Sequence, residues 1–161
     1  MKKHVGLSVY VEINGELHVA LQRRGLYDHE NGFGLEVWAG GCQPLVHGGM
    51  ESHESDPFEA LKREGGEEVG REFMIEAVKY PTKLEDTEEA FFMATKMAIE
   101  SLNLIRWHVS SGGLALLTEE ELVKCKDLSC LEREKPVLSN VIAMFPHDLK
   151  FVKMGFDLYR K

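Results

Sequence analysis

The sequence has few cysteines, no long hydrophobic run and no excess of positive charge. Its three cysteines, Cys42, Cys125 and Cys130, form neither a dense disulfide framework nor a zinc-binding pattern. We therefore expect three free thiols in a reducing compartment. No apolar run approaches the roughly 20 residues of a membrane helix, and the amino-terminal segment is not signal-like. These absences favour a cytoplasmic protein that is not embedded in a membrane.

Positive charge is scarce, because 19 Lys and Arg residues face 27 Asp and Glu residues, for a formal net charge of -8. Nucleic acids and acidic membrane surfaces bind to basic faces, so neither is expected as a partner. An anionic small molecule is still compatible with this charge, because bound divalent cations can supply positive charge locally.

Length and patterning favour a single domain over 1–161, with 43% hydrophobic residues to form its core. The runs 5–13 and 16–22 are rich in β-branched and apolar residues, and Asn14-Gly15 between them predicts a hairpin with a type I′ turn. A helix is predicted over 57–70, because Asp56 suits the N-cap, Pro57 the first turn and Gly70 the residue after the end.

The other segments are less regular. We expect strands over 73–78, 102–109 and 113–117, and a short helix capped by Thr118. Residues 88–101 fit either a helix or a buried strand, and 40–56 show little periodicity. The segment 136–159 is predicted as one helix, or two interrupted near Pro146. Strands before and after a central helix indicate a mixed α/β domain.

The most informative feature is the charge pattern of the predicted helix. Glu64, Glu67 and Glu68 stand at i, i+3 and i+4, so their carboxylates share one face. Like charges at this spacing cost roughly 0.2–0.5 kcal/mol a pair, and Gly65 and Gly66 cost about 0.8–1.0 kcal/mol each relative to alanine. Acidic faces are usually only solvated. A hard cation such as Mg²⁺ would nevertheless offset the repulsion and bridge the acids to a substrate phosphate.

The neighbouring residues favour the metal. Charged positions and glycines recur over 48–70 at set intervals: Gly48, Glu54, Arg63, Glu64, Glu67, Glu68 and Gly70. This pattern resembles the Nudix box of the Nudix hydrolase superfamily, and the hairpin upstream and the elements downstream also look like that family. The resemblance implies an α/β (α+β) fold, an α/β/α sandwich with a mixed sheet and a catalytic loop and helix.

The spacing departs from the box at one point. Glu54 precedes Arg63 by one residue more than is usual, and alignment from the helix end would use Gly49 and Ser55 instead. We prefer a one-residue insertion at 55–57, because it falls in the loop before the helix and leaves the helical spacing intact.

Two apolar positions of the box are also changed. Gly65 follows the Arg-Glu pair, which removes a core contact but lets the helix pack closely, and Arg71 stands at the terminal apolar position. Neither change removes a carboxylate from the helix, so the departures concern fine geometry more than activity.

By resemblance, four groups would hold Mg²⁺ or Mn²⁺: the backbone carbonyl of Gly48 and the carboxylates of Glu64, Glu67 and Glu68. Glu64 is the favoured alternative as base for the attacking water, and Arg63 and Glu54 would hold the acids in place. Metal ions would neutralise a pyrophosphate and activate a water for in-line attack on phosphorus. The implied substrate is a nucleoside diphosphate linked to another moiety, or a related phosphoanhydride.

Arginines and tryptophans outside the box are further candidates. Arg23 and Arg24 end the predicted hairpin, where they fit a substrate phosphate and a solvated strand end equally well. Trp38 and Trp107 could stack on a base, but large aromatic side chains more often pack in or around the core.

Histidines and acids outside the box complete the set. We expect His47 and His53 to be solvated loop residues, and 118–121 to be a helix start instead of a metal site. Some Nudix hydrolases place a further catalytic acid downstream, and four residues are eligible for that role here: Glu85, Asp86, Glu88 and Glu89.

Two other functions fit the same fold. An isopentenyl-diphosphate isomerase would use a Trp and a Cys ahead of a degraded box, and the segment from Trp38 to Cys42 is faintly similar, but the Arg-Glu and Glu-Glu pairs are intact here. A non-catalytic nucleotide sensor would typically have a broken box. Residues past the box that are typical of particular substrate subfamilies are absent, so the sequence does not identify the substrate. The resemblance also implies that a homodimer is possible.

Overall fold

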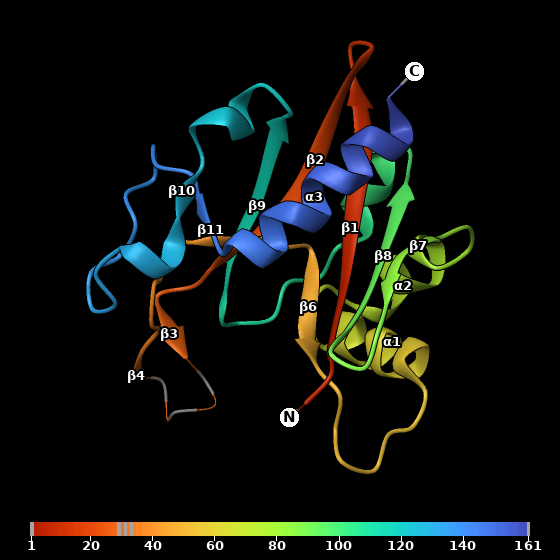
Figure 1. Ribbon diagram of the computed structural model, residues 1–161, viewed down its shortest axis with the longest axis horizontal. Coiled ribbons are helices and arrows are strands. Elements are labelled where there is room, and N and C mark those ends of the chain that lie inside the picture. The colour runs from red at the N-terminus through yellow and green to blue at the C-terminus, as the bar shows by residue number, and fades with distance from the viewer. Residues whose placement is uncertain (1, 29, 31, 33, 161) are drawn as a thin grey trace.

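The computed structural model, which describes residues 2–28, 30, 32 and 34–160, is built on a mixed sheet of seven strands (Figure 1). Its order is β5-β2-β1-β8-β7, with β6 also paired to β1 and β9 to β2. The strands are β1 (His4–Ile13), β2 (Glu16–Arg24), β5 (Cys42–Pro44), β6 (Val46–Gly49), β7 (Thr82–Asp86), β8 (Ala90–Lys96) and β9 (Ser111–Thr118). β1 and β8 run parallel, and the other pairs in this sheet are antiparallel.

Helices and short elements complete the fold. The α-helices are α1 (Pro57–Glu68), α2 (Arg71–Ala77) and α3 (Pro146–Tyr159), and 3-10 helices span Ile99–Leu104, Glu121–Lys124 and Leu128–Cys130. Two small ribbons lie beside the main sheet: β3 (Tyr27–Asp28) with β4 (Gly34–Leu35), and β10 (Lys126–Asp127) with β11 (Ala143–Met144). Among the described residues, no helix has the length and apolar character needed to cross a membrane.

The sheet separates two apolar layers because successive side chains of a strand point to opposite faces. Val5, Leu7 and Val9 of β1 join the cluster under α1 and α2, whereas Tyr10 joins the cluster under α3. In Figure 1, α3 crosses the front of the sheet. The mixed α/β fold with helices on both faces is therefore confirmed.

The predicted hairpin is present as β1 and β2. Asn14 and Gly15 have φ values of 52° and 81°, the left-handed conformation that a type I′ turn requires. The strand predicted over 113–117 is also present, as β9, and residues 88–101 form β8 followed by the start of a 3-10 helix. Thr118 and Glu121 exchange hydrogen bonds at the start of the next 3-10 helix.

Other local predictions were wrong. Residues 73–78, predicted as a strand, belong mostly to α2, because Phe73 and Ala77 are buried at helical spacing. The segment 102–109, predicted as a strand, is the end of a 3-10 helix followed by an irregular stretch. The helix predicted over 136–159 begins only at Pro146, as α3. The segment 40–56, which shows little periodicity in the sequence, contains β5 and β6.

The adjacent glycines of α1 give a prediction about stability. A Cβ at Gly65 would lie 2.2 Å from the Met74 Sδ of α2, whereas at Gly66 it would meet nothing within 4 Å. Gly66→Ala should therefore raise the free energy of unfolding by about 0.8–1.0 kcal/mol through helix propensity alone. Gly65→Ala has the same propensity gain but should lower stability, because overpacking costs about 1–3 kcal/mol. Urea denaturation measures the free energy of unfolding of both variants. An equal change in the two variants would contradict the close packing of α1 on α2.

Candidate active site

The helix α1 forms as the sequence predicts. The Asp56 side chain accepts a hydrogen bond from the Phe58 N–H at 2.9 Å, and Pro57 occupies the first turn. Val69 is the C-cap, and Gly70 has a φ of 96°, which L side chains rarely adopt. The chain can therefore turn sharply into α2 directly after the three glutamates.

Arg63 connects the loop before α1 to the acids on its surface. Its Nε and Nη2 each donate to the Glu54 carboxylate at 2.9 Å, and Nη2 also donates to the Gly49 carbonyl at 3.0 Å. Its Nη1 donates to Glu64 at 3.1 Å and to Glu67 at 3.4 Å. The hydrogen bonds from Arg63 lower the pKa of Glu54 to about 2. Glu54 is thus the partner of Arg63, as the one-residue insertion requires.

Gly48 provides a close approach between β6 and α1. A Cβ at this position would lie 2.2 Å from the carboxylate carbon of Glu64 and 2.4 Å and 2.6 Å from its two oxygens. A larger residue here would displace this carboxylate, so glycine lets β6 and Glu64 lie close together. Whether the Gly48 carbonyl and Glu64 share a metal ion stays a prediction.

Glu68 is held at the edge of the sheet. The backbone N–H of His47 donates to its Oε2 at 3.1 Å. Burial raises the pKa of Glu68 to about 8, although hydrogen bonds from His47 and Gln22 act in the opposite direction. Burial also raises the pKa of Glu64. Both carboxylates are therefore partly withdrawn from water, and Glu64 alone of the two is paired with Arg63, at 3.1 Å.

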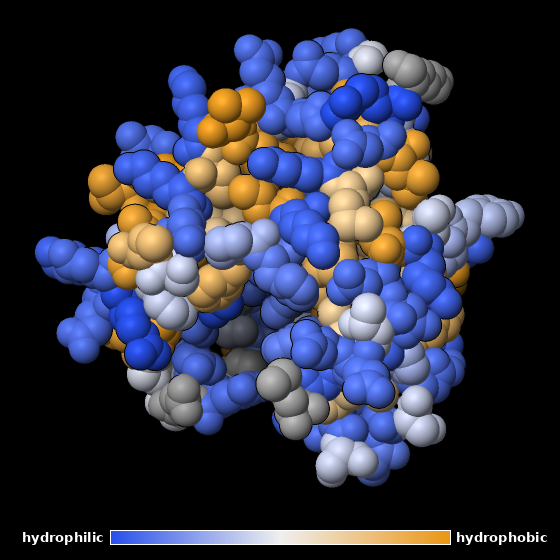
Figure 2. Space-filling view, viewed as in Figure 1, coloured by the Kyte–Doolittle hydropathy of each residue, from blue (hydrophilic) through white to orange (hydrophobic). Residues whose placement is uncertain are grey.

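All three helix acids line one cleft of about 700 Å³. Figure 2 shows this face of the molecule hollowed between the places that β3 and β6 occupy in Figure 1, with mostly hydrophilic residues around the hollow. The lining comprises Gln22, Arg24, Gly25, Asp28, Glu30, Glu36, Gln43, Glu51, Glu64, Glu67, Glu68, His108 and Ser110. Among these described residues, Arg24 is the one permanently cationic side chain, so a polyphosphate would need further positive charge to bind.

The donors fit a hard divalent cation in kind. Glu64 and Glu68 offer partly buried carboxylate oxygens, which are the ligands that such cations prefer, and Gly48 leaves room for its backbone to approach Glu64. However, within the part of the chain that the structure describes, no three acidic, histidine or cysteine side chains are already gathered as a metal site. Glu67 is instead 59% exposed and paired with Arg63.

The two arginines at the end of β2 have different surroundings. Arg23 donates from Nη1 to the Gly40 carbonyl at 3.0 Å and does not line the cleft. Arg24 lines the cleft, pairs with Glu36 at 3.3 Å and lies over the Phe145 ring at 5.4 Å. Its Nε is buried, with no hydrogen-bond partner among the described residues. Of the two, only Arg24 is placed to contact a ligand.

The tryptophans have packing roles. The Trp38 Nε1 donates to the Leu131 carbonyl at 3.1 Å, and its ring meets the edge of Phe145. Trp107 packs against the core under α1 and α2. Neither tryptophan lines the cleft.

The three cysteines, Cys42, Cys125 and Cys130, are free thiols, as the sequence predicts, and burial raises the pKa of Cys42.

The remaining candidates lie elsewhere. Asp86 pairs with Lys3 at 2.9 Å, and none of the four downstream acids, 85, 86, 88 and 89, lines the cleft. His53 is exposed as expected. The expectation of a solvated loop was wrong for His47, which lies in β6 with its Nε2 3.4 Å from Asp148 Oδ1.

His108 is a residue of the cleft that sequence analysis missed. The Ser110 backbone N–H donates to its Nδ1 at 3.1 Å, and because that nitrogen must accept, the neutral imidazole carries its proton on Nε2. The His108 N–H in turn donates to the Glu68 backbone carbonyl at 3.1 Å. The sequence held no signal for this role, because the segment resembles a strand.

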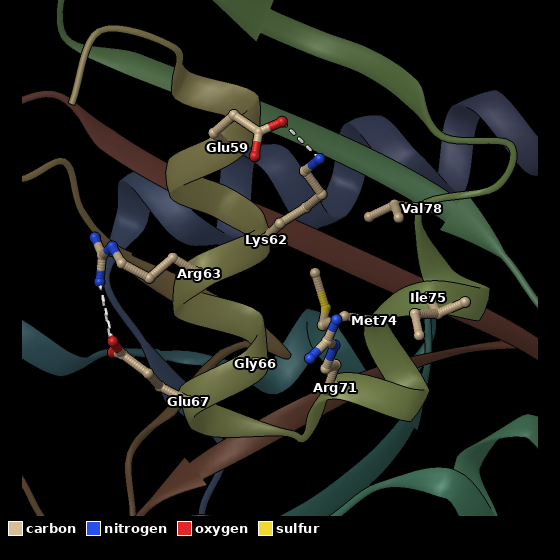
Figure 3. Close-up of a pocket in the computed structure, with 9 residues that line it drawn as sticks. All are labelled: Glu59, Lys62, Arg63, Gly66, Glu67, Arg71, Met74, Ile75 and Val78. Atoms are coloured by element: carbon tan, nitrogen blue, oxygen red, sulfur yellow. Dashed lines mark hydrogen bonds and ion pairs between the residues drawn. The ribbon is translucent and has the colours of Figure 1, made fainter.

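A second hollow, of about 560 Å³, lies on the outer side of α1 and α2 (Figure 3). Lys62 reaches toward Glu59 there, and Arg63 toward Glu67. Neither Glu64 nor Glu68 lines it. The acids therefore open mainly to the first cleft, which we take as the candidate active site.

Comparisons with known proteins identify the fold and the family. The NUDIX domain of NrtR from Shewanella oneidensis, solved with ADP ribose, has a similar fold, with a TM-score of 0.59 and 10% identity, covering 96% of this chain and 86% of that one. A mutT/nudix family protein from Listeria innocua has a TM-score of 0.55 and 16% identity, with coverage of 98% and 91%. No curated protein matches the chain. The family model described as NUDIX domain matches residues 2–139, and the chain therefore belongs to this family.

Proposed function

We propose that the protein is a Mg²⁺- or Mn²⁺-dependent hydrolase that cleaves a phosphoanhydride bond, with the whole chain, 1–161, acting as one domain. The observation that carries the proposal is that Glu64, Glu67 and Glu68 of the box all line one cleft. Family membership supports the reaction class. The substrate class is a nucleoside diphosphate linked to another moiety.

A divalent cation bound there would neutralise the pyrophosphate and lower the pKa of a bound water. Glu64 and Glu68, with the Gly48 carbonyl, would hold the cation, and Glu67 would join them after a side-chain movement away from Arg63. Glu64 is the alternative base for the attacking water. Arg63 and Glu54 orient the acids through the hydrogen bonds described above.

One other side chain of the cleft, that of Arg24, is suited to the substrate. Arg24 lines the cleft, and the guanidinium fork of an arginine matches phosphate oxygens. Glu36 and Phe145 already fix its position. We propose Arg24, and not Arg23, as the arginine that contacts the substrate.

The isomerase alternative has less support. Its catalytic thiol would be Cys42, but this side chain is fully buried in the core under α3 and does not line the cleft. Burial also raises the pKa of Cys42, so the thiol stays protonated. A nucleotide sensor would typically have a broken box, whereas the three glutamates of the box are present here and line one cleft.

The test is release of phosphate-containing products from a panel of nucleoside diphosphate derivatives, beginning with ADP-ribose, with Mg²⁺ or with EDTA. We expect turnover of at least one compound with Mg²⁺ and none with EDTA. Binding of a panel member without turnover would favour the sensor, and turnover that EDTA does not change would contradict the metal mechanism.

A further inference from the structure

β6 presents one side chain to the face of the sheet that α3 covers. Val46 joins the core under α1, and Gly48 meets Glu64 on that same side. By alternation, His47 and Gly49 point to the α3 face, and Gly49 has no side chain. His47 alone can therefore connect β6 to α3 through a side chain.

The imidazole of His47 meets a buried carboxylate of α3. Its Nε2 lies 3.4 Å from Oδ1 of Asp148, which is 3% exposed and stands in the first turn of that helix. Within the described part of the chain, His47 is the one ion-pair partner of this carboxylate. The ring also stacks on His4 at 5.8 Å and lies 6.0 Å from Phe92. These contacts place the ring between Asp148, His4 and Phe92, and the contact with Asp148 is an ion pair when His47 is protonated.

The backbone of the same residue meets the candidate active site. β6 is paired to β1 along one edge, with Gly6 opposite His47. On its other edge the His47 N–H donates to Glu68 Oε2 at 3.1 Å. A rotation of β6 about its axis would change the direction of this N–H and also the approach of Gly48 to Glu64. His47 thus joins α3 to Glu68, and the next residue of β6, Gly48, lies against Glu64.

We propose that the contact between Asp148 and His47 is a positioning link, through which α3 sets the direction of the β6 backbone and so orients Glu68. Asp148 and His47 are positioning residues, and their side chains do not line the cleft. The effect on hydrolysis rests on the proposed function. The link itself belongs to the metal-free protein and can be measured there.

Asp148→Ala removes the acceptor, and Asp148→Asn keeps an oxygen in its place. Asp157→Ala, on the exposed side of the same helix, is the matched control. In metal-free protein we expect the amide resonance of His47 in ¹H–¹⁵N NMR spectra to move in Asp148→Ala as its hydrogen bond to Glu68 weakens. We also expect the Kd for Mn²⁺ to weaken about tenfold, the scale for residues that orient metal ligands. Asp148→Asn should have a His47 amide shift and a Kd for Mn²⁺ close to those of the unmodified protein. Asp157→Ala should match the unmodified protein in both quantities.

His47→Phe is a second variant that keeps a ring against His4 and Phe92 but removes Nε2. It should weaken Mn²⁺ binding as Asp148→Ala does, and it carries the test if that variant does not fold. A folded Asp148→Ala protein with an unchanged His47 amide, or a folded His47→Phe protein with unchanged Mn²⁺ affinity, would overturn the link. Absence of hydrolysis in the unmodified protein would contradict the proposed function alone, because the His47 amide is measured without metal or substrate.

Discussion

Glu68→Gln is expected to lower the turnover of phosphoanhydride hydrolysis by about a hundredfold or more while the protein stays folded. Glutamine keeps the size of the side chain and one oxygen to accept the His47 N–H. It removes the charge that would hold a divalent cation in the cleft. Steady-state kinetics with saturating Mg²⁺ measure the effect, with far-ultraviolet circular dichroism as the check on folding.

The same variant should be more stable than the unmodified protein at pH 8 in EDTA. Burial raises the pKa of Glu68 from 4.5 to about 8, so the folded state keeps a proton that the unfolded state releases. The free energy of unfolding of the metal-free protein therefore falls as the pH rises from 4.5 to about 8. Glutamine does not ionise, so Glu68→Gln lacks this decrease. A melting temperature that is lower for Glu68→Gln than for the unmodified protein would contradict the buried, uncompensated carboxylate.

Glu72→Gln provides the control for both measurements. Glu72 is an exposed acid in the first turn of α2, four residues after Glu68, and it does not line the cleft. Its replacement should change neither turnover nor the pH dependence of stability. Full turnover in Glu68→Gln would remove Glu68 from the mechanism and with it the metal site proposed here.

Glu54→Gln is expected to lower turnover or metal affinity by about 10- to 100-fold, the range for residues that orient metal ligands. Its carboxylate receives two hydrogen bonds from Arg63 at 2.9 Å, and a neutral amide cannot reproduce this paired, charge-assisted geometry. Arg63 would then hold Glu64 and Glu67 less firmly. Mn²⁺ titration and kinetics of the same samples separate the loss of binding from the loss of turnover.

Ser55→Ala tests the alternative alignment of the box. Without the insertion, Ser55 would stand where the box has its first glutamate. In the structure, however, Arg63 donates both hydrogen bonds to Glu54. Ser55→Ala should therefore leave activity within about twofold of the unmodified protein, because single exposed substitutions have small effects. A larger loss in Ser55→Ala than in Glu54→Gln would show that the insertion is misplaced.

Local signals were enough to predict the parts of the fold that hold the box. Asn14-Gly15 predicted the hairpin and Asp56-Pro57 the start of α1, because each depends on backbone preferences of adjacent residues. The shared face of the three glutamates followed from helical geometry alone. The same geometry could not show that Arg63 also bonds to Glu54 and to the Gly49 carbonyl, since those contacts cross the loop before α1.

Elements that depend on distant contacts were predicted less well. Residues 73–78 have the apolar composition of a strand, yet they form a helix whose Met74 fills the space left by Gly65. His108 enters the cleft because its N–H bonds to the end of α1, a contact between residues 40 positions apart in the sequence. His47 likewise gains its role from Asp148, which a local pattern cannot reveal.

The helix α3 has a consequence for where this protein can be divided. The family match ends at residue 139, seven residues before α3 begins. Yet Phe151, Val152 and Phe156 of that helix are buried on the sheet, and the Tyr10 hydroxyl donates to the Val152 carbonyl at 2.6 Å. A fragment ending at 139 would retain all seven residues of the box but expose one apolar side of its sheet, including Tyr10. We therefore expect a fragment that ends where the family match ends to be less stable than the chain 1–161.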